Sequence, residues 1–289
     1  MLRSHDRYSY APIVDRARGR WPDGAGLAVY VALNLEHYAW GEGLVEDLVP
    51  GIPKPDVLNN SWRDYGNRVG AWRLLELFQD LSIPVTLLVN SELYGACPQL
   101  LAAFRSHGAE VASHGRTNSE RQAELDESQE RALIDEVTRT IARHEGRAPA
   151  GWLSPWIAET DLTPDLLHEA GYRYLLDWCM DDQPVWMKTR RGRLLAVPYP
   201  QELNDSAAII GRQVDAHEFA TMIVDQFDEM REQAQRGAPL VMGISLHSMI
   251  AGQPFRIRAL RSALQHIASN RDQCWLTTAG AIALATPDA

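Results

Sequence analysis

The feature that most constrains this chain is the alternation of short apolar runs with helical patterns along nearly its whole length. The first run, Leu27 to Leu33, is continuously apolar, as are strands of a parallel sheet that is buried on both faces. Further runs of this kind lie at 84–89, 109–112, 151–153, 172–176, 194–197, 240–246 and 274–277. The alternation predicts an α/β chain, first a (β/α) barrel with irregular closure and second a doubly wound sheet.

Amphipathic spacing predicts the main helices between these strands. Trp72, Leu75 and Phe78 lie three residues apart and predict a helix over 69–81. Asp126 is expected to cap a long helix that reaches 144. Other helices are predicted at 98–104, at 215–235, at 255–268 and at the carboxyl end. The polar segment 36–64 is too long for an ordinary connection, which predicts a functional role for it.

Composition narrows the possible classes of protein. A length of 289 residues with 45% hydrophobic residues suits one catalytic domain over 1–289. The net charge of −10 argues against a nucleic-acid surface. Three cysteines without paired spacing fit a reducing compartment. The first eight residues lack the apolar core of a signal peptide, and no apolar run could span a membrane. We expect a cytoplasmic homo-oligomer that acts on a small molecule and binds neither nucleic acid nor membrane.

Polar side chains recur where the predicted strands end. Because the carboxyl ends of parallel strands open on one face, residues that are scattered in sequence are expected to converge there. The candidates for this face are Asn34, Glu36, His114, Ser154, Trp156, Asp177, Asp181 and His247. Each has an ordinary explanation as well: a histidine can cap a turn, aspartates are favoured in turns, and tryptophans fill cores. Their shared position is the stronger signal.

The residues around His114 predict a hydrolase site that has lost its metal. A metal hydrolase would place a second imidazole one helical turn after the first, so that two nitrogens converge on one ion. Asn118 occupies that place here, and its amide is a poor ligand for zinc. We therefore expect no cofactor, with a divalent metal such as zinc at His114 as the alternative.

The order of several motifs resembles the polysaccharide deacetylase superfamily, and more closely its branch of metal-independent bacterial allantoinases and related cyclic imidases. The most discriminating are Tyr65-Gly-X-Arg68 and Gly70-X-Trp72-Arg-Leu-Leu75, and the likeness runs from about Tyr10 to the carboxyl terminus. These two motifs lie in the matching segment 64–75, and the other matching segments are 30–36, 113–115, 149–152, 181–184, 197–199, 204–205 and 246–247.

This resemblance implies a deformed (β/α) barrel and hydrolysis of a carbon–nitrogen bond other than a peptide bond, in a superfamily associated with carbohydrate metabolism. In metal-dependent deacetylases, two aspartates end the first strand, in the region where Asn34 and Glu36 stand here. The chain also departs from the allantoinases at Arg116-Thr117-Asn118 and at Ser154-Pro155-Trp156-Ile157. Because these segments are expected to line the pocket, the substrate is expected to be a relative of allantoin rather than allantoin itself.

Opening a cyclic amide without a metal needs a base for water, a partner for the oxyanion and an acid for the leaving nitrogen. Glu36 is the candidate for water activation or substrate orientation, and His114 or His247 for proton donor or oxyanion partner. Asp177 or Asp181 could orient an imidazole or accept bonds from ring N–H groups. The predicted substrate-binding residues are Asn34, Asn118 and Arg256 for polar contacts and Trp156 and Trp178 for an apolar wall.

Three functions compete at this level. The first is a metal-independent hydrolase of a cyclic amide, ureide or imide. The second is a metal-dependent deacetylase of N-acetylated sugars, with a carboxylate such as Asp177 completing a site at His114. The third is a catalytically inactive homologue that binds a ligand in the retained pocket.

Overall fold

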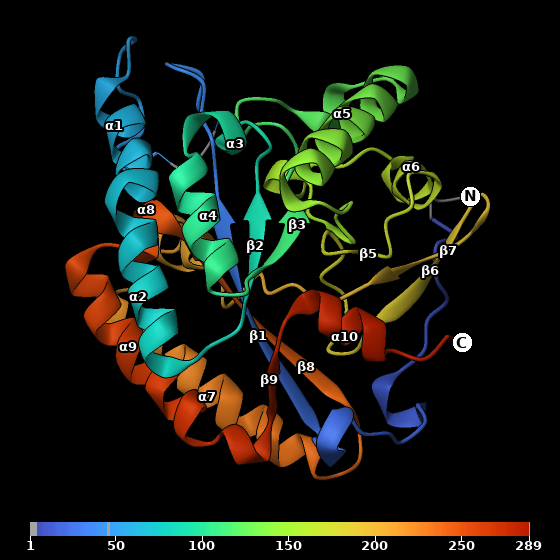
Figure 1. Cartoon of the computed structure of the whole chain (residues 1–289). Helices are drawn as coiled ribbons and strands as arrows, with labels where there is room; N and C mark the ends of the chain where they lie inside the picture. Colours follow the sequence, from blue (N-terminus) through green and yellow to red (C-terminus); the bar gives the residue numbers. More distant parts are fainter. Residues whose placement is uncertain (1–4, 45–46, 289) are drawn as a thin grey trace.

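The computed structural model describes residues 5–44 and 47–288, and its centre is one predominantly parallel sheet surrounded by helices (Figure 1). The strands occur in the order β6-β7-β5-β4-β3-β2-β1-β8, and β9 pairs with the first half of β1. Their bounds are β1 Leu27–Leu35, β2 Val85–Val89, β3 Glu110–Ser113, β4 Gly151–Trp152, β5 Tyr174–Leu175, β6 Val185–Thr189, β7 Gly192–Ala196, β8 Leu240–His247 and β9 Trp275–Thr277.

The strand order distinguishes between the two predicted architectures. From β5 to β1 each strand pairs with its predecessor in the chain, as in a barrel, whereas a doubly wound sheet reverses direction part-way along. Closure is incomplete, because no ladder within the described ranges joins β8 to β6. The segment between β7 and α7 pairs with that edge instead, through a bridge between Asn204 and Ser245. The deformed (β/α) barrel with irregular closure predicted from the sequence is confirmed, and the structure adds that its sheet is not closed.

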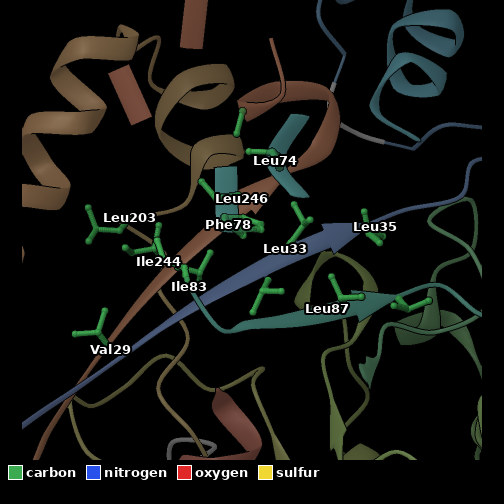
Figure 2. Packing of buried hydrophobic residues seen from close by; sticks show 14 of the residues in the cluster. Val29, Leu33, Leu35, Leu74, Phe78, Ile83, Leu87, Leu203, Ile244 and Leu246 are labelled. Carbon is green, nitrogen blue, oxygen red and sulfur yellow. The ribbon is translucent and has the colours of Figure 1, made fainter. Parts of the chain in front are cut away.

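Alternation along the strands divides the core into two layers. On β1, the odd-numbered residues from Leu27 to Leu35 pack outward against the helices, together with Phe78 of α2 and Ile244 of β8 (Figure 2). The even-numbered residues of β1 face inward, where Tyr30 packs with other buried residues of the sheet and of α10. The same alternation, with the odd-numbered residues facing inward on β8, directs Asn34, His114 and His247 to the inner face at the strand ends.

Most helices pack against the outer face of the sheet, whereas α10 packs against the inner layer and α1 packs on α8 in a separate small cluster. Helices α2, α7 and α9 lie along one side of β1 and β8, and α5 lies on the opposite side (Figure 1). The bounds are α1 Val57–Tyr65, α2 Ala71–Leu81, α3 Leu93–Ala96, α4 Pro98–Ser106, α5 Glu127–Glu145, α6 Thr163–Glu169, α7 Ala216–Ala234, α8 Ser248–Ala251, α9 Pro254–Ser269 and α10 Ala279–Ala285.

Most predicted helices are confirmed, and the differences have local causes. Asp126 caps α5 through a capping box with Gln129. The helix predicted from 69 starts at Ala71, because residues 66–70 form a π-helical turn packed on α8. A Cβ at Gly70 would collide there with the Ser248 carbonyl. The predicted elements did not include α1 inside the long polar segment, the short α6, or β6. Strand β6 forms an antiparallel hairpin with β7.

Across residues 5–44 and 47–288, no helix has the length and apolar character needed to cross a lipid bilayer. The first four residues, part of the segment that showed no signal-peptide pattern, lie outside the described residues.

Candidate active site

A cavity of about 180 Å³ lies where β1, β3 and β8 end. Parallel pairing brings Asn34 opposite His247, and Glu36 follows two residues later on the same face as Asn34. His114 directly follows β3, and Gly115 turns the chain there with a φ of +63°. The lining residues are Asn34, Glu36, His114, Leu153, Ser154, Trp156, Ile157, Tyr199, Gln201, Asn204, Ser206, Ala207 and His247.

Glu36 is the centre of the polar cluster. Its Oε1 lies 3.5 Å from His114 Nε2 and 3.6 Å from His247 Nε2, and it accepts a 2.7 Å hydrogen bond from Asn118 Nδ2. Its Oε2 accepts a 2.6 Å bond from the Tyr38 hydroxyl. The side chains of Glu36, His114 and His247 are each at least 94% buried. One carboxylate oxygen thus faces two imidazoles that come from distant strands.

His247 is oriented by a fully buried aspartate. Asp205 Oδ1 lies 2.7 Å from His247 Nδ1, and both of its carboxylate oxygens accept bonds from the His247 backbone N–H at 3.0 and 2.9 Å. A carboxylate on Nδ1 places the proton there, so that Nε2 faces Glu36 as a lone pair or as the second N–H of an imidazolium. The arrangement matches the histidine–aspartate pair of nucleophilic hydrolases.

The His114 ring is oriented in the same sense by a backbone group. Its Nδ1 lies 2.9 Å from the Leu153 carbonyl oxygen, which can only accept a hydrogen bond, so Nδ1 carries a proton. Both imidazoles therefore direct Nε2 toward Glu36 Oε1. Because two bare lone pairs next to a carboxylate would repel it, this geometry favours at least one proton on the two facing nitrogens.

The charge state of Glu36 follows from these neighbours. Burial alone would raise its pKa, but the opposing charge of His247, the bond and charge of His114 and the Tyr38 hydroxyl together lower the pKa to about 2. Glu36 therefore stays ionised near neutral pH. A carboxylate with so low a pKa is a weak proton acceptor, so Glu36 acts chiefly as a fixed negative charge beside the two imidazoles.

Two buried carboxyl groups, those of Asp177 and Glu159, form a pair beside the cavity. Asp177 Oδ1 accepts a 2.7 Å bond from the Ser154 backbone N–H, and Glu159 Oε1 accepts a 2.8 Å bond from Trp178 Nε1. Burial and then the neighbouring Asp177 raise the pKa of Glu159 to about 10, and burial raises that of Asp177 as well. The two carboxyls therefore hold a proton near neutral pH.

This pair predicts a distinct pH dependence of stability. A carboxyl whose pKa is raised by folding stabilises the protein fully below its unfolded pKa of 4.5, and this stabilisation is lost as pH rises toward 10. Between these two pH values, this carboxyl should lower the free energy of unfolding of the wild type by up to about 1.4 kcal/mol per pH unit. We expect Glu159→Gln to abolish this decrease. Denaturant titrations at pH 5, 7 and 9 measure it, with the exposed Glu124→Gln as control. Parallel curves for wild type and Glu159→Gln would contradict the shared proton.

The turn after β4 has an unusual backbone. Trp156 and Ile157 both adopt left-handed conformations, with φ of +63° and +53°. Such conformations cost non-glycine residues on the order of 1–3 kcal/mol each and persist only where the surroundings impose them. Pro155 packs against Gly115, where any Cβ would lie only 2.7 Å from the proline ring. The strained turn is therefore fixed against the His114 turn.

The structure brings most of the predicted site residues together. Asn34 lines the cavity and donates from Nδ2 to Tyr199, Ser245 and the Leu246 carbonyl. Trp156 lines the cavity, and Asn118 lies behind Glu36 as its hydrogen-bond donor. Asp177 does not line the cavity but supports it through the Ser154 backbone.

Three predicted residues lie elsewhere, each for a local reason. Asp181 pairs with Arg16 at 2.5 Å and accepts a bond from the backbone of its own turn. Trp178 packs its ring against His5 and Tyr8, with ring centroids 5.2 and 5.8 Å apart. Arg256 donates to the Ile250 carbonyl and lies over its neighbouring Phe255 ring. Distant partners hold Asp181 and Trp178 away from the cavity lining, whereas the partners of Arg256 are close to it in the sequence.

Two residues that contact the catalytic candidates had no assigned role in the sequence reading. Asp205 belongs to the segment 204–205 that carried part of the family resemblance, and this was the one signal that could have singled it out. Tyr38 lies two residues beyond Glu36, in the long polar segment, and gave no signal of its own. Both act on their partners through contacts made only in the folded chain.

The donor set does not fit a tightly bound zinc ion. Both Glu36 oxygens already accept hydrogen bonds, and Asn118 presents its amide nitrogen, a donor, toward the carboxylate. His247 and His114 both face that same carboxylate oxygen at 3.5–3.6 Å. Throughout the part of the chain that the structure describes, no group of three or more His, Cys, Asp or Glu side chains is arranged to hold a metal ion.

Comparisons with known proteins agree with this fold. Residues 63–175 match the family model described as Polysaccharide deacetylase. A putative polysaccharide deacetylase of Schizosaccharomyces pombe is 27% identical, with 92% of this chain and 91% of that protein covered. A probable polysaccharide deacetylase from Pseudomonas aeruginosa PAO1 superimposes with a TM-score of 0.82 at 28% identity, and Puue allantoinase with 0.81 at 27%; each match covers 93% of both chains.

Proposed function

This chain carries a polysaccharide deacetylase domain and superimposes on an allantoinase, as its sequence led us to expect, and we propose a function on that basis. The proposed reaction is the opening of a cyclic amide, ureide or imide without a metal. Membership in this hydrolase superfamily supports hydrolysis of a carbon–nitrogen bond in general. The finer assignment rests mainly on one observation, the carboxylate of Glu36 facing His114 and His247 through a single oxygen.

The geometry supports a division of roles between the two imidazoles. His247, oriented by Asp205, accepts a proton from water at Nε2 as the water oxygen bonds to the ring carbonyl carbon. His114, protonated opposite Glu36, donates its Nε2 proton to the leaving nitrogen as the carbon–nitrogen bond breaks. Water thus supplies the hydroxyl to carbon, and the proton lost by His114 equals the one gained by His247.

Glu36 connects the two imidazoles between turnovers. Its Oε1 lies 3.5 Å from His114 Nε2 and 3.6 Å from His247 Nε2, so its negative charge acts on both rings while they exchange protons with water. During turnover its negative charge stabilises whichever imidazole is charged. This role differs from direct water activation, the role first considered for Glu36, and suits its lowered pKa.

The dimensions of the cavity favour a small ring. Its volume of about 180 Å³ lies below the roughly 300–1,000 Å³ of pockets for drug-sized ligands. The Trp156 side chain provides an apolar wall of the kind that suits a flat ring. The segment Ser154–Ile157, in which this chain departs from the allantoinases, forms that wall, which supports a substrate other than allantoin.

Deacetylation of an N-acetylated sugar is the second candidate, favoured by the names of relatives. One of them is a peptidoglycan deacetylase of Helicobacter pylori, 22% identical over 260 residues, with 78% of this chain and 86% of that protein covered. The donor set at Glu36, which does not suit zinc, argues against the metal-dependent form of this reaction.

A substrate panel with metal analysis tests the proposal. The purified protein should hold well below one equivalent of zinc after dialysis. It should hydrolyse at least one of succinimide, glutarimide, hydantoin, dihydrouracil and allantoin, at a rate unchanged by a chelator. Stoichiometric zinc together with release of acetate from N-acetylglucosamine oligomers would establish the second candidate. Absence of turnover of the five cyclic substrates and of the N-acetylglucosamine oligomers would contradict both proposed activities.

A further inference from the structure

The long segment that follows Glu36 returns toward the active site at its far end. Arg63 lies in the last turn of α1, and its side chain is only 4% exposed. Its guanidinium carbon lies 4.8 Å from the centre of the Tyr38 ring, within the range of a cation–π contact. The Tyr38 hydroxyl donates to Glu36 Oε2 at 2.6 Å. A buried cation therefore reaches the central carboxylate through one tyrosine, and the proposed chemistry gives this cation no role.

Separate contacts hold the guanidinium over the ring. Its Nη2 pairs with Asp47 at 2.5 Å. The backbone of Gly43 packs on it so closely that a Cβ at this position would collide with the guanidinium. Helix α1 is itself held in place, because it packs on α8, which directly follows His247, and a Cβ at Gly66 would collide with α8. The position of Arg63 is thus tied to the strand end that carries His247.

The two kinds of contact on the Tyr38 ring act differently. The ring packs with a small apolar cluster that contains Trp62 and Ile250, and its centre lies 6.4 Å from that of Trp156. Apolar packing is non-directional, so by itself it does not fix where the hydroxyl points. A cation on the ring face is attracted in a defined geometry, and it also draws electron density from the phenol, which makes the hydroxyl a better donor.

We infer that Arg63 is a positioning residue of this active site, which holds the Tyr38 hydroxyl on Glu36 and so keeps the other carboxylate oxygen in front of both imidazoles. For its effect on turnover the inference rests on the proposed function, whereas the contact itself can be observed without a substrate. The guanidinium stays charged at every working pH, so the contact does not titrate. Because Arg63 does not line the cavity, its loss should act on kcat rather than KM.

The Tyr38 signal gives a readout that needs no turnover. The chain has nine tyrosines, and in protein labelled with ¹³C at tyrosine Cζ the resonance missing from Tyr38→Phe identifies this one. Arg63→Met keeps the length of the side chain and removes its charge. We expect it to move the Tyr38 resonance upfield, because a phenol that donates more weakly to a carboxylate has less phenolate character. Arg63→Lys keeps a cation and should stay nearer to wild type, and the exposed Arg139→Met should leave the resonance unmoved.

Gly43→Ala displaces the guanidinium without changing Arg63 itself. The new Cβ meets the flexible end of the Arg63 side chain, which must move. We expect the Tyr38 resonance to move in the same direction as in Arg63→Met. Gly95→Ala is the matched control, because its Cβ would meet nothing within 4 Å. An unmoved Tyr38 resonance in both variants would overturn the inference, and if Arg63→Met does not fold, Gly43→Ala decides alone.

Kinetics on a hydrolysed cyclic substrate separate positioning from general support of the fold. If Arg63 acts through the hydroxyl, Tyr38→Phe sets the largest loss that Arg63 can cause. We expect Arg63→Met to lower kcat about three- to tenfold with little change in KM, the size of effect typical of a partly desolvated cation–π contact. In the Tyr38→Phe background the same substitution should add less than about twofold.

The outcomes distinguish this inference from the proposed function. Equal losses of kcat from Arg63→Met in both backgrounds would show that Arg63 only supports the fold, and would overturn the inference while leaving the hydrolysis established. Absence of turnover on every cyclic substrate would contradict the proposed hydrolysis. In that case the Tyr38 resonance still decides: a shift in Arg63→Met and Gly43→Ala supports the positioning contact, and an unmoved resonance overturns it.

Discussion

Glu36→Gln should lower the turnover of a cyclic substrate by about 10²- to 10³-fold, the range typical for loss of one preorganised electrostatic contact in an active site. The substitution keeps the shape of the side chain and removes the negative charge that faces His114 and His247. The amide can still accept from Asn118, and the Tyr38 hydroxyl can rotate to accept from the new N–H. The fold should therefore persist, and ligand affinity should change little.

Steady-state kinetics and ligand titration on the same preparation test this expectation. Glu42→Gln is the matched control, an exposed glutamate in the loop that follows Glu36. A modest loss of turnover would mean that Glu36 only orients ring N–H groups, because an amide oxygen can accept those bonds. Unchanged turnover and affinity would remove Glu36 from the site altogether.

His247→Ala should reduce turnover about a hundredfold or more, and Asp205→Asn should approach the same loss. Alanine removes the proposed base. An asparagine has only one side-chain oxygen, whereas both carboxylate oxygens of Asp205 accept hydrogen bonds. In the variant, the amide NH₂ group therefore either replaces the oxygen that accepts only from the His247 backbone, and loses that bond, or replaces the oxygen that faces Nδ1 and presents an N–H to it. The second arrangement reverses the tautomer and leaves a proton on Nε2, which then cannot accept one from water.

The effect should fall on kcat rather than KM if Asp205 acts by positioning His247. Imidazole ¹⁵N shifts of His247 should report the altered tautomer in Asp205→Asn, a change that general destabilisation would not produce. His114→Ala should lose turnover to a similar extent, whereas the exposed His217→Ala should retain it. Near wild-type activity in both His114→Ala and His247→Ala would show that these histidines are structural.

The sequence by itself determined the fold class and the inner face of the site. Continuous apolar runs such as Leu27–Leu33 can be stable only when buried on both faces, which requires a parallel sheet covered by helices. The carboxyl ends of parallel strands open on one face, so Asn34, His114 and His247 could be grouped there without any distance. Asn118 stands where a metal hydrolase would have a second histidine, and its amide is a poor ligand for zinc, so the sequence alone argued against a zinc site.

Only the tertiary structure decided which polar residues reach the cavity and what state they adopt there. Asp181 and Asp177 looked alike as turn aspartates, yet Arg16 holds the first away while the second supports the Ser154 turn. The Asp205 contact to His247 joins residues 42 positions apart, so no local pattern encodes it. Hydrogen bonds and pKa values depend on such distances and on burial, and these exist only once the strands have brought separate segments together.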